Sequence, residues 1–132
     1  MELLEPYKVT VFVIGMSGLM LLVQILLADI VAIKLKHTPG FPIEPDHDNF
    51  LFRAARAYSN TNETVAIFVL FAIFGMASGA SALYLNAFAV TYLAGRLGHM
   101  IFYYANVQVA RSLAFVVCLI GLIGMFITGL LF

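Results

Sequence analysis

Charged residues are scarce in this sequence. Asp, Glu, Lys and Arg make up only 11% of its 132 residues, whereas apolar and aromatic residues make up 63%. Soluble domains have about 25% charged residues, so this chain lacks the charge that would cover a soluble surface. Its apolar content is sufficient for about four helices of the roughly 20 apolar residues that a bilayer crossing needs. The composition therefore excludes an ordinary soluble domain and predicts a single small membrane domain over residues 1–132.

An excess of either charge is also absent. Seven Lys and Arg balance seven Asp and Glu, so the formal net charge is zero, and we expect no basic patch for nucleic acid. The single cysteine, Cys118, lies in an uncharged run. Alone it forms neither an intramolecular disulfide nor a four-ligand zinc site, so we expect a core or lipid-facing thiol. The first residues are acidic where a secretory signal would be basic, which predicts that the first apolar run is a retained span.

Proline is rare outside one segment. Three of the four prolines fall in residues 37–48, together with three carboxylates, so this segment is expected to be an exposed loop. His37 and His47 stand among these carboxylates, but their spacing matches no established metal motif. We therefore interpret them as solvated loop residues and predict no metal site.

The distribution of charge predicts four spanning helices in an up-down bundle. Their expected ranges are 8–35, 50–78, 82–106 and 109–131. Both termini then lie on one side of the membrane, and the two loops 34–50 and 104–111 lie on the other. The loop side has most of the bases, and the terminal side has only Lys8. The positive-inside tendency places the loops in the cytoplasm and the termini outside.

Several polar residues interrupt the predicted spans, where ionisable groups usually face a bundle interior or a water-filled cavity. At 100° per residue, one face of the second helix has four of them: Arg53, Arg56, Asn60 and Glu63. One face of the third helix has three: Arg96, His99 and Tyr103. With Lys34 and Arg111 from neighbouring helix ends, these faces would form a cationic cleft that suits an anion. Snorkelling or interhelical packing is the alternative explanation for any one of these residues.

Two segments in this order resemble the MAPEG family, the membrane-associated proteins of eicosanoid and glutathione metabolism. Residues 52–63, FRAARAYSNTNE, look like the family's second-helix motif. Residues 95–112, GRLGHMIFYYANVQVARS, are similar to the third-helix and fourth-helix motif of its prostaglandin-synthase branch. The resemblance covers essentially the whole chain. It implies an all-α integral membrane protein, a left-handed four-helix bundle that forms a homotrimer and binds glutathione between subunits near the cytoplasmic face.

The resemblance also implies a role for each matching residue. Arg111 matches the arginine next to the glutathione thiol, and Ser112 matches a neighbouring hydroxyl proposed to assist it, so these two are the expected catalytic residues. The positions that match glutathione-binding residues are Lys34, Arg53, Arg56, Asn60, Glu63, Arg96, His99 and Tyr103. Phe115 stands where the prostaglandin branch has a tyrosine, and the connection between helices three and four is one residue shorter. Both departures count against prostaglandin synthesis.

The expected function is that of a membrane glutathione transferase or peroxidase acting on lipophilic electrophiles or hydroperoxides. Glutathione has two carboxylates and one ammonium, which several Arg and Lys donors and one Glu acceptor match in charge. Its thiol, with a pKa of about 8.5, is mostly protonated at neutral pH. A guanidinium beside the sulfur lowers that pKa and favours the nucleophilic thiolate.

Two alternatives stay open at the level of sequence. One is a small four-span transporter of the multidrug type, although such a protein usually centres a carboxylate in its first span, whereas Asp29 is close to the span's end. Asp29 itself is either an interfacial cap or a partner for a cation. The other alternative is a non-catalytic binding protein with the MAPEG fold. The expected location is the inner or plasma membrane of a bacterium, or the endoplasmic reticulum of a eukaryote, with the active site toward the cytoplasm.

Overall fold

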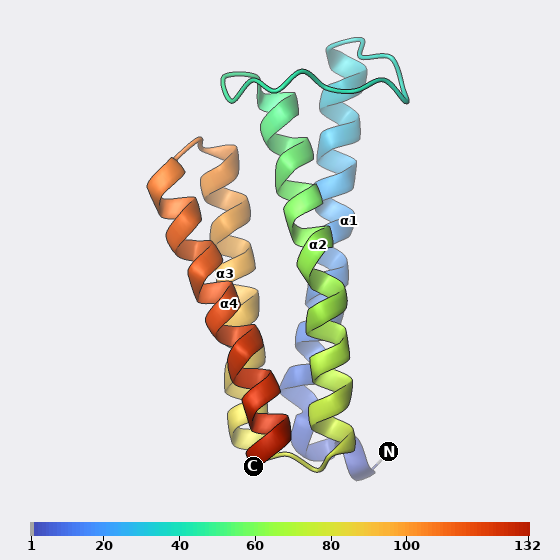
Figure 1. The fold of residues 1–132 in the computed structure, drawn as a ribbon. Helices are drawn as coiled ribbons and strands as arrows, with labels where there is room; N and C mark the ends of the chain where they lie inside the picture. The colour runs from blue at the N-terminus through green and yellow to red at the C-terminus, as the bar shows by residue number, and fades with distance from the viewer. Residues whose placement is uncertain (1) are drawn as a thin grey trace.

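The computed structural model describes residues 2–132, which form four antiparallel helices (Figure 1). A short 3-10 helix precedes them, and the elements in chain order are η1 (Glu2–Tyr7), α1 (Lys8–Lys34), α2 (Phe50–Ala77), α3 (Ala82–Tyr104) and α4 (Gln108–Leu131). Each long helix begins and ends within two residues of the range expected from sequence. We call the end with both chain termini and the α2–α3 turn the terminal end. The loop end has the 35–49 loop and the α3–α4 turn (Figure 1).

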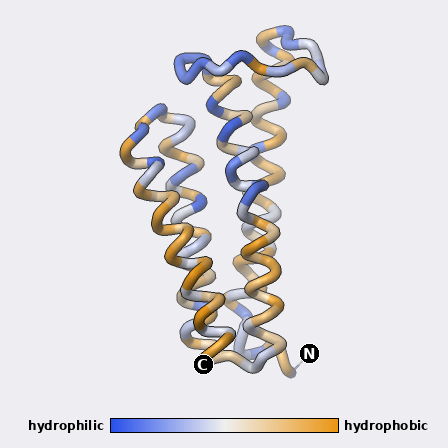
Figure 2. The backbone as a smooth tube through the Cα atoms, viewed as in Figure 1, coloured by the Kyte–Doolittle hydropathy of each residue, from blue (hydrophilic) through white to orange (hydrophobic). Residues whose placement is uncertain are grey.

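Three helical segments are long and apolar enough to cross a membrane: Glu2–Lys34, Phe50–Ala77 and Gln108–Leu131. Hydrophilic residues concentrate toward the loop end, and the terminal half is mostly hydrophobic (Figure 2). Large apolar side chains such as Phe12, Leu70 and Ile123 are exposed on the outside of the bundle. An apolar exterior of this kind fits lipid as the surrounding solvent.

α3 does not meet the same criterion of apolar composition, so the fourth crossing stays a prediction. Four of its polar side chains nevertheless point inward, since Tyr92, Arg96, His99 and Tyr103 are all buried. At 1.5 Å per residue its 23 residues extend about 34 Å, enough for a hydrocarbon layer of roughly 30 Å. α3 therefore has the length of a span, and the face that contains these four residues points into the bundle interior.

Local sequence explains where the helices begin and end. The side chain of Asn49 accepts a hydrogen bond of 3.0 Å from the backbone N–H of Leu51, which caps the start of α2 just after the proline-rich loop. α2 ends at a turn in which Gly79 has φ +69°, a left-handed conformation that favours glycine. Asn106, with φ 59°, makes the corresponding turn after α3. The break expected near residues 78–81 is confirmed.

The closest helix pair is α3 and α4, which touch through small residues. A Cβ added to Gly121 would lie 2.6 Å from the backbone nitrogen of Tyr92, and one added to Gly95 would collide with the backbone of Cys118. Only a residue without a side chain permits this approach of two helix backbones. The α3–α4 spacing is therefore set by these two glycines.

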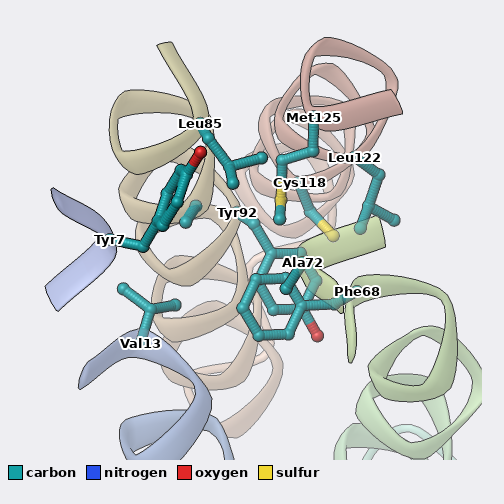
Figure 3. Close-up of a cluster of buried hydrophobic side chains, with 10 residues drawn as sticks. Tyr7, Val13, Phe68, Ala72, Leu85, Tyr92, Cys118, Leu122 and Met125 are labelled. Carbon is teal, nitrogen blue, oxygen red and sulfur yellow. The ribbon is translucent and has the colours of Figure 1, made fainter. Parts of the chain in front are cut away.

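The hydrophobic core, whose buried side chains are drawn in Figure 3, consists of residues from the terminal half of the bundle. The rings of Phe68 and Tyr92 stack there with centroids 4.3 Å apart and planes 2° apart. Cys118 is a free thiol buried in this core, which is one of the two environments expected for it. Because this core is filled with side chains from η1 and all four helices, it holds the bundle together in the terminal half.

Candidate functional site

A cavity of about 390 Å³ opens at the loop end between α2, α3 and α4. We call it the Arg111 cavity, and it is lined by Arg56, Asn60, His99, Tyr103, Arg111, Ser112, Phe115 and Val116. Its volume falls within the roughly 300–1,000 Å³ of small-molecule sites. Six of the ten residues expected to form the site therefore meet here, from three different helices.

Arg111 lies in the first turn of α4 and reaches across to α3. Its guanidinium carbon is 4.3 Å from the centroid of the Tyr103 ring, a cation–π arrangement. Its Nη1 atom is buried and has no hydrogen-bond partner within residues 2–132. The neighbouring Ser112 is exposed, and its hydroxyl donates to the carbonyl of Gln108 at 3.1 Å. Tyr103 thus positions a guanidinium that keeps an unsatisfied donor at the cavity.

Arg96 lies behind the cavity wall and does not line it. The side chain is fully buried and donates to the carbonyl of Asn60 at 3.1 Å and to its side-chain Oδ1 at 2.8 Å. The guanidinium carbon also lies 5.3 Å from the centroid of the Phe115 ring. These contacts join α3 to α2 and α4, so Arg96 holds Asn60 and Phe115 in place from beneath the cavity.

His99 completes the aromatic side of the cavity. Its ring centroid lies 5.3 Å from that of Tyr103 and 6.0 Å from that of Phe115. The ring is buried, and its Nδ1 atom has no partner in the part of the chain that is described. His99 therefore offers a further polar atom that a bound ligand would satisfy.

In the structure Arg53 and His47 contact each other at the edge of the site, outside the lining of the Arg111 cavity. Arg53 does not reach the cavity, because its Nη1 atom donates to the carbonyl of His47 at 2.6 Å and its guanidinium lies over the ring of Phe50. His47 is not a freely solvated loop residue, since its ring is 6.2 Å from that of Tyr103 and nearly parallel to it. Arg53 thus anchors the 35–49 loop against the rim of the site. No local pattern predicts the His47 contact, because the two rings come from segments far apart in sequence.

Lys34 and Glu63 are also outside the Arg111 cavity of a single chain, and both are exposed. Lys34 ends α1, and α1 contributes no residue to the cavity. Glu63 and Arg53 lie at the two edges of the polar face predicted for α2, and these two edges face different surroundings. Arg56 and Asn60, in the middle of that polar face, are the residues that line the cavity.

The Arg111 cavity is cationic without an acidic counterpart. Arg56 and Arg111 line it, and no carboxylate does. Across residues 2–132, the one ion pair joins Lys8 to Glu5 at the terminal end. The same residues contain no group of three His, Cys, Asp or Glu side chains that could hold a metal ion. The geometry therefore favours an organic anion with hydrogen-bonding groups.

Comparison with known proteins agrees with this geometry at the level of the family. The model of the MAPEG family matches residues 10–131, nearly the whole chain. No curated protein and no solved structure matches. The family match spans all four helices and every residue that lines the Arg111 cavity. The chain therefore belongs to the MAPEG family.

Proposed function

We propose that the chain binds glutathione in the Arg111 cavity and activates it as the thiolate for attack on lipophilic electrophiles or hydroperoxides. Membership of the MAPEG family supports a glutathione-related transferase or related activity. One observation carries the more specific proposal: two arginines, an asparagine, a histidine and a tyrosine from three helices converge on one cavity.

The donors in this cavity fit the charges of glutathione. A buried polar atom without a partner costs about 1–3 kcal/mol, so a set of such atoms requires an explanation. Arg111 Nη1 and His99 Nδ1 are atoms of this kind at the cavity. The anionic groups of glutathione, its thiolate and its carboxylates, would satisfy them. Arg56, which also lines the cavity, is available to bind a carboxylate through two parallel hydrogen bonds.

Arg111 is the residue that we assign to the thiol. Glutathione supplies the sulfur nucleophile, and its thiol is mostly protonated at neutral pH because its pKa is about 8.5. A guanidinium beside the sulfur stabilises the thiolate and lowers that pKa. The exposed hydroxyl of Ser112 lines the same cavity and would donate a second hydrogen bond to the sulfur after leaving the Gln108 carbonyl.

A homotrimer is the second part of this proposal. Glu63 is exposed in the middle of α2, and an ionised carboxylate within a span costs a few kcal/mol unless it faces a partner or water. A neighbouring subunit that covers this face would bring Glu63 and Lys34 into a shared site, where Glu63 accepts from the glutathione ammonium. Light scattering corrected for detergent should give three times the 14.5 kDa mass of one chain. A monomer that still binds glutathione would contradict the inter-subunit site.

Isothermal calorimetry of the detergent-purified protein tests the function directly. Glutathione and its S-hexyl derivative should both bind, and Arg56→Ala should weaken both. Lys36→Ala is the matched control, because Lys36 is an exposed loop-end cation outside the cavity. An equal loss of affinity in the two variants would refute the assignment. Binding without turnover of a chloronitrobenzene or of cumene hydroperoxide would indicate the non-catalytic alternative.

A further inference from the structure

A second and larger cavity, of about 620 Å³, lies between α1, the 35–49 loop and α2. We call it the Asp29 cavity. Its walls are largely apolar, with Ile25 and Ile33 from α1, Phe41 and Ile43 from the loop, and Leu51 from α2. Its volume also falls within the usual range of small-molecule sites. The glutathione chemistry proposed above makes no use of this cavity.

The two cavities lie on different faces of α2. Ala55 and Ser59 line the Asp29 cavity, whereas Arg56 and Asn60 line the Arg111 cavity. Each pair is spaced by four residues, and neighbouring residues are turned by about 100° around a helix. The same two turns of α2 therefore serve both cavities through different faces.

Asp29 is the one carboxylate that lines the second cavity. It lies five residues before the end of α1, or about 7.5 Å along the helix axis. Its side chain makes no ion pair and no hydrogen bond with any residue from 2 to 132. Asp29 is exposed, so its carboxylate is open to a cation that enters the cavity from outside the chain. This position fits one of the two roles left open by the sequence, a partner for a cation.

The remaining polar groups of the cavity leave the charge of Asp29 uncompensated. Lys34 and Lys36 are exposed and do not line it. His37 lines it, but its Nε2 atom is 3.0 Å from the carbonyl of Phe41, a contact within the loop. That contact fixes the turn that brings Phe41 to the cavity wall. The hydroxyl groups of Tyr58 and Ser59 also line the cavity and are neutral.

We propose that the Asp29 cavity binds an amphiphile with a protonated amine, whose ammonium contacts Asp29 and whose apolar part follows the hydrophobic walls. An exposed carboxylate beside apolar walls favours a cationic head over a neutral one through charge complementarity. The cavity is at the membrane–water boundary expected for the loop end, where such an amphiphile concentrates. This binding is independent of glutathione and goes beyond the proposed function.

Fluorescence titration of the full-length protein in phosphatidylcholine nanodiscs tests the proposal. The probe is dansylcadaverine, a primary amine with an apolar fluorophore, and its N-acetylated form is the neutral control. The amine should bind saturably with a blue-shifted emission and at least tenfold more tightly than the neutral form. Asp29→Asn keeps the side-chain shape and should remove this preference. Asp48→Asn, at an exposed carboxylate outside the cavity, should leave it unchanged.

A second variant, Ala28→Leu, adds volume inside the cavity and should weaken both probes. Equal affinities of the two probes for the native protein, or native amine affinity in Asp29→Asn, would overturn the proposal. So would a loss of the oligomer in Asp29→Asn, because the carboxylate would then pair with a second copy of the chain. Asp29→Asn should retain native glutathione affinity in calorimetry. Absence of glutathione binding in the native protein would defeat the proposed function alone.

Discussion

The two ends of the bundle differ in how their polar groups are paired. At the terminal end the Tyr7 hydroxyl donates to the Ala80 carbonyl at 2.6 Å, and Asn86 hydrogen-bonds to Thr10 and Pro6. At the loop end, by contrast, Arg53, Arg96, His99 and Arg111 all have buried nitrogen atoms with no partner within the described chain. A satisfied polar network rigidifies a structure, whereas unsatisfied buried donors indicate a missing ligand or water. The comparison places a structural clamp at the terminal end and the candidate site at the loop end.

Packing follows the same division. The stacked rings of Phe68 and Tyr92 and the rest of the core lie in the terminal half. Toward the loop end, the α1–α2 pair and the α3–α4 pair lie further apart in Figure 1, and the Arg111 cavity is found there. The core therefore holds the helices together in the terminal half, and the polar residues of the Arg111 cavity lie where the two helix pairs diverge.

Membrane topology gives the largest expected difference between the two ends. In intact cells, cysteines placed at Thr38 and Gln108 should be shielded from an impermeant thiol reagent and should label only after permeabilisation. Cysteines at Leu3 and Ser78 should label in intact cells. All four positions are exposed, and the native Cys118 is buried and serves as the unlabelled control. The reverse pattern would refute the orientation, and labelling of position 78 together with the loop end would refute four crossings.

Arg111→Ala should have the next largest effect, at the loop end only. It removes the charge that we place beside the sulfur, so kcat/KM should fall on the order of 100-fold, as for loss of one transition-state donor. The pKa of the bound thiol should rise toward about 8.5, so its ultraviolet thiolate absorbance should appear at higher pH. Glutathione affinity should fall only modestly, and Lys36→Ala should change neither quantity. An unchanged thiolate titration would move the role to another cation.

Arg96→Met separates positioning from stability at the loop end. The change removes two hydrogen bonds to Asn60, and bonds from a charged donor are worth about 1.5–3 kcal/mol. Glutathione affinity in calorimetry should therefore drop by roughly tenfold or more. The free energy of unfolding should change by less than these bonds suggest, because their loss is offset by removing a buried charge that makes no ion pair within residues 2–132. Lys8→Met, at an exposed cation of the terminal end, is the control. Native glutathione affinity in the Arg96→Met protein, together with a lower free energy of unfolding, would contradict the positioning role.

Tyr7→Phe should have the smallest effect, and only at the terminal end. It removes the hydroxyl that donates to Ala80, which should lower the free energy of unfolding by about 1 kcal/mol. Glutathione affinity should stay at the native value. Tyr84→Phe provides the matched control, because Tyr84 is exposed and its hydroxyl makes no hydrogen bond to residues 2–132. A fall in glutathione affinity with Tyr7→Phe would break the division between the two ends.

Helix bounds were predictable because they depend on local sequence. The proline-rich stretch before Asn49, the Ser-Gly-Ala-Ser turn and the long uncharged runs mark where helices begin and end. The central residues of the site were predictable for a similar reason, since helical periodicity places Arg56 with Asn60, and His99 with Tyr103, on common faces. Family membership itself follows from the sequence, through the match to residues 10–131.

Periodicity does not say what each face meets. Arg53 belongs to the polar face of α2 but binds the His47 carbonyl, and Glu63, at the other edge of that face, is exposed. Arg96 has the spacing of a cavity residue but lies behind the wall. The direction of a side chain follows from its place on the helix, whereas its surroundings depend on where the other helices lie.

The sequence by itself determined the membrane-type composition, the four helices and the chemistry of the side chains, because these depend on residues close together along the chain. Only the tertiary structure decided that His47 stacks on Tyr103 and that Asp29 faces the 35–49 loop across a cavity. It also decided the close approach of α3 and α4 at Gly95 and Gly121. Each of these depends on the distance between segments far apart in sequence, which the packing of whole helices sets and no local pattern encodes.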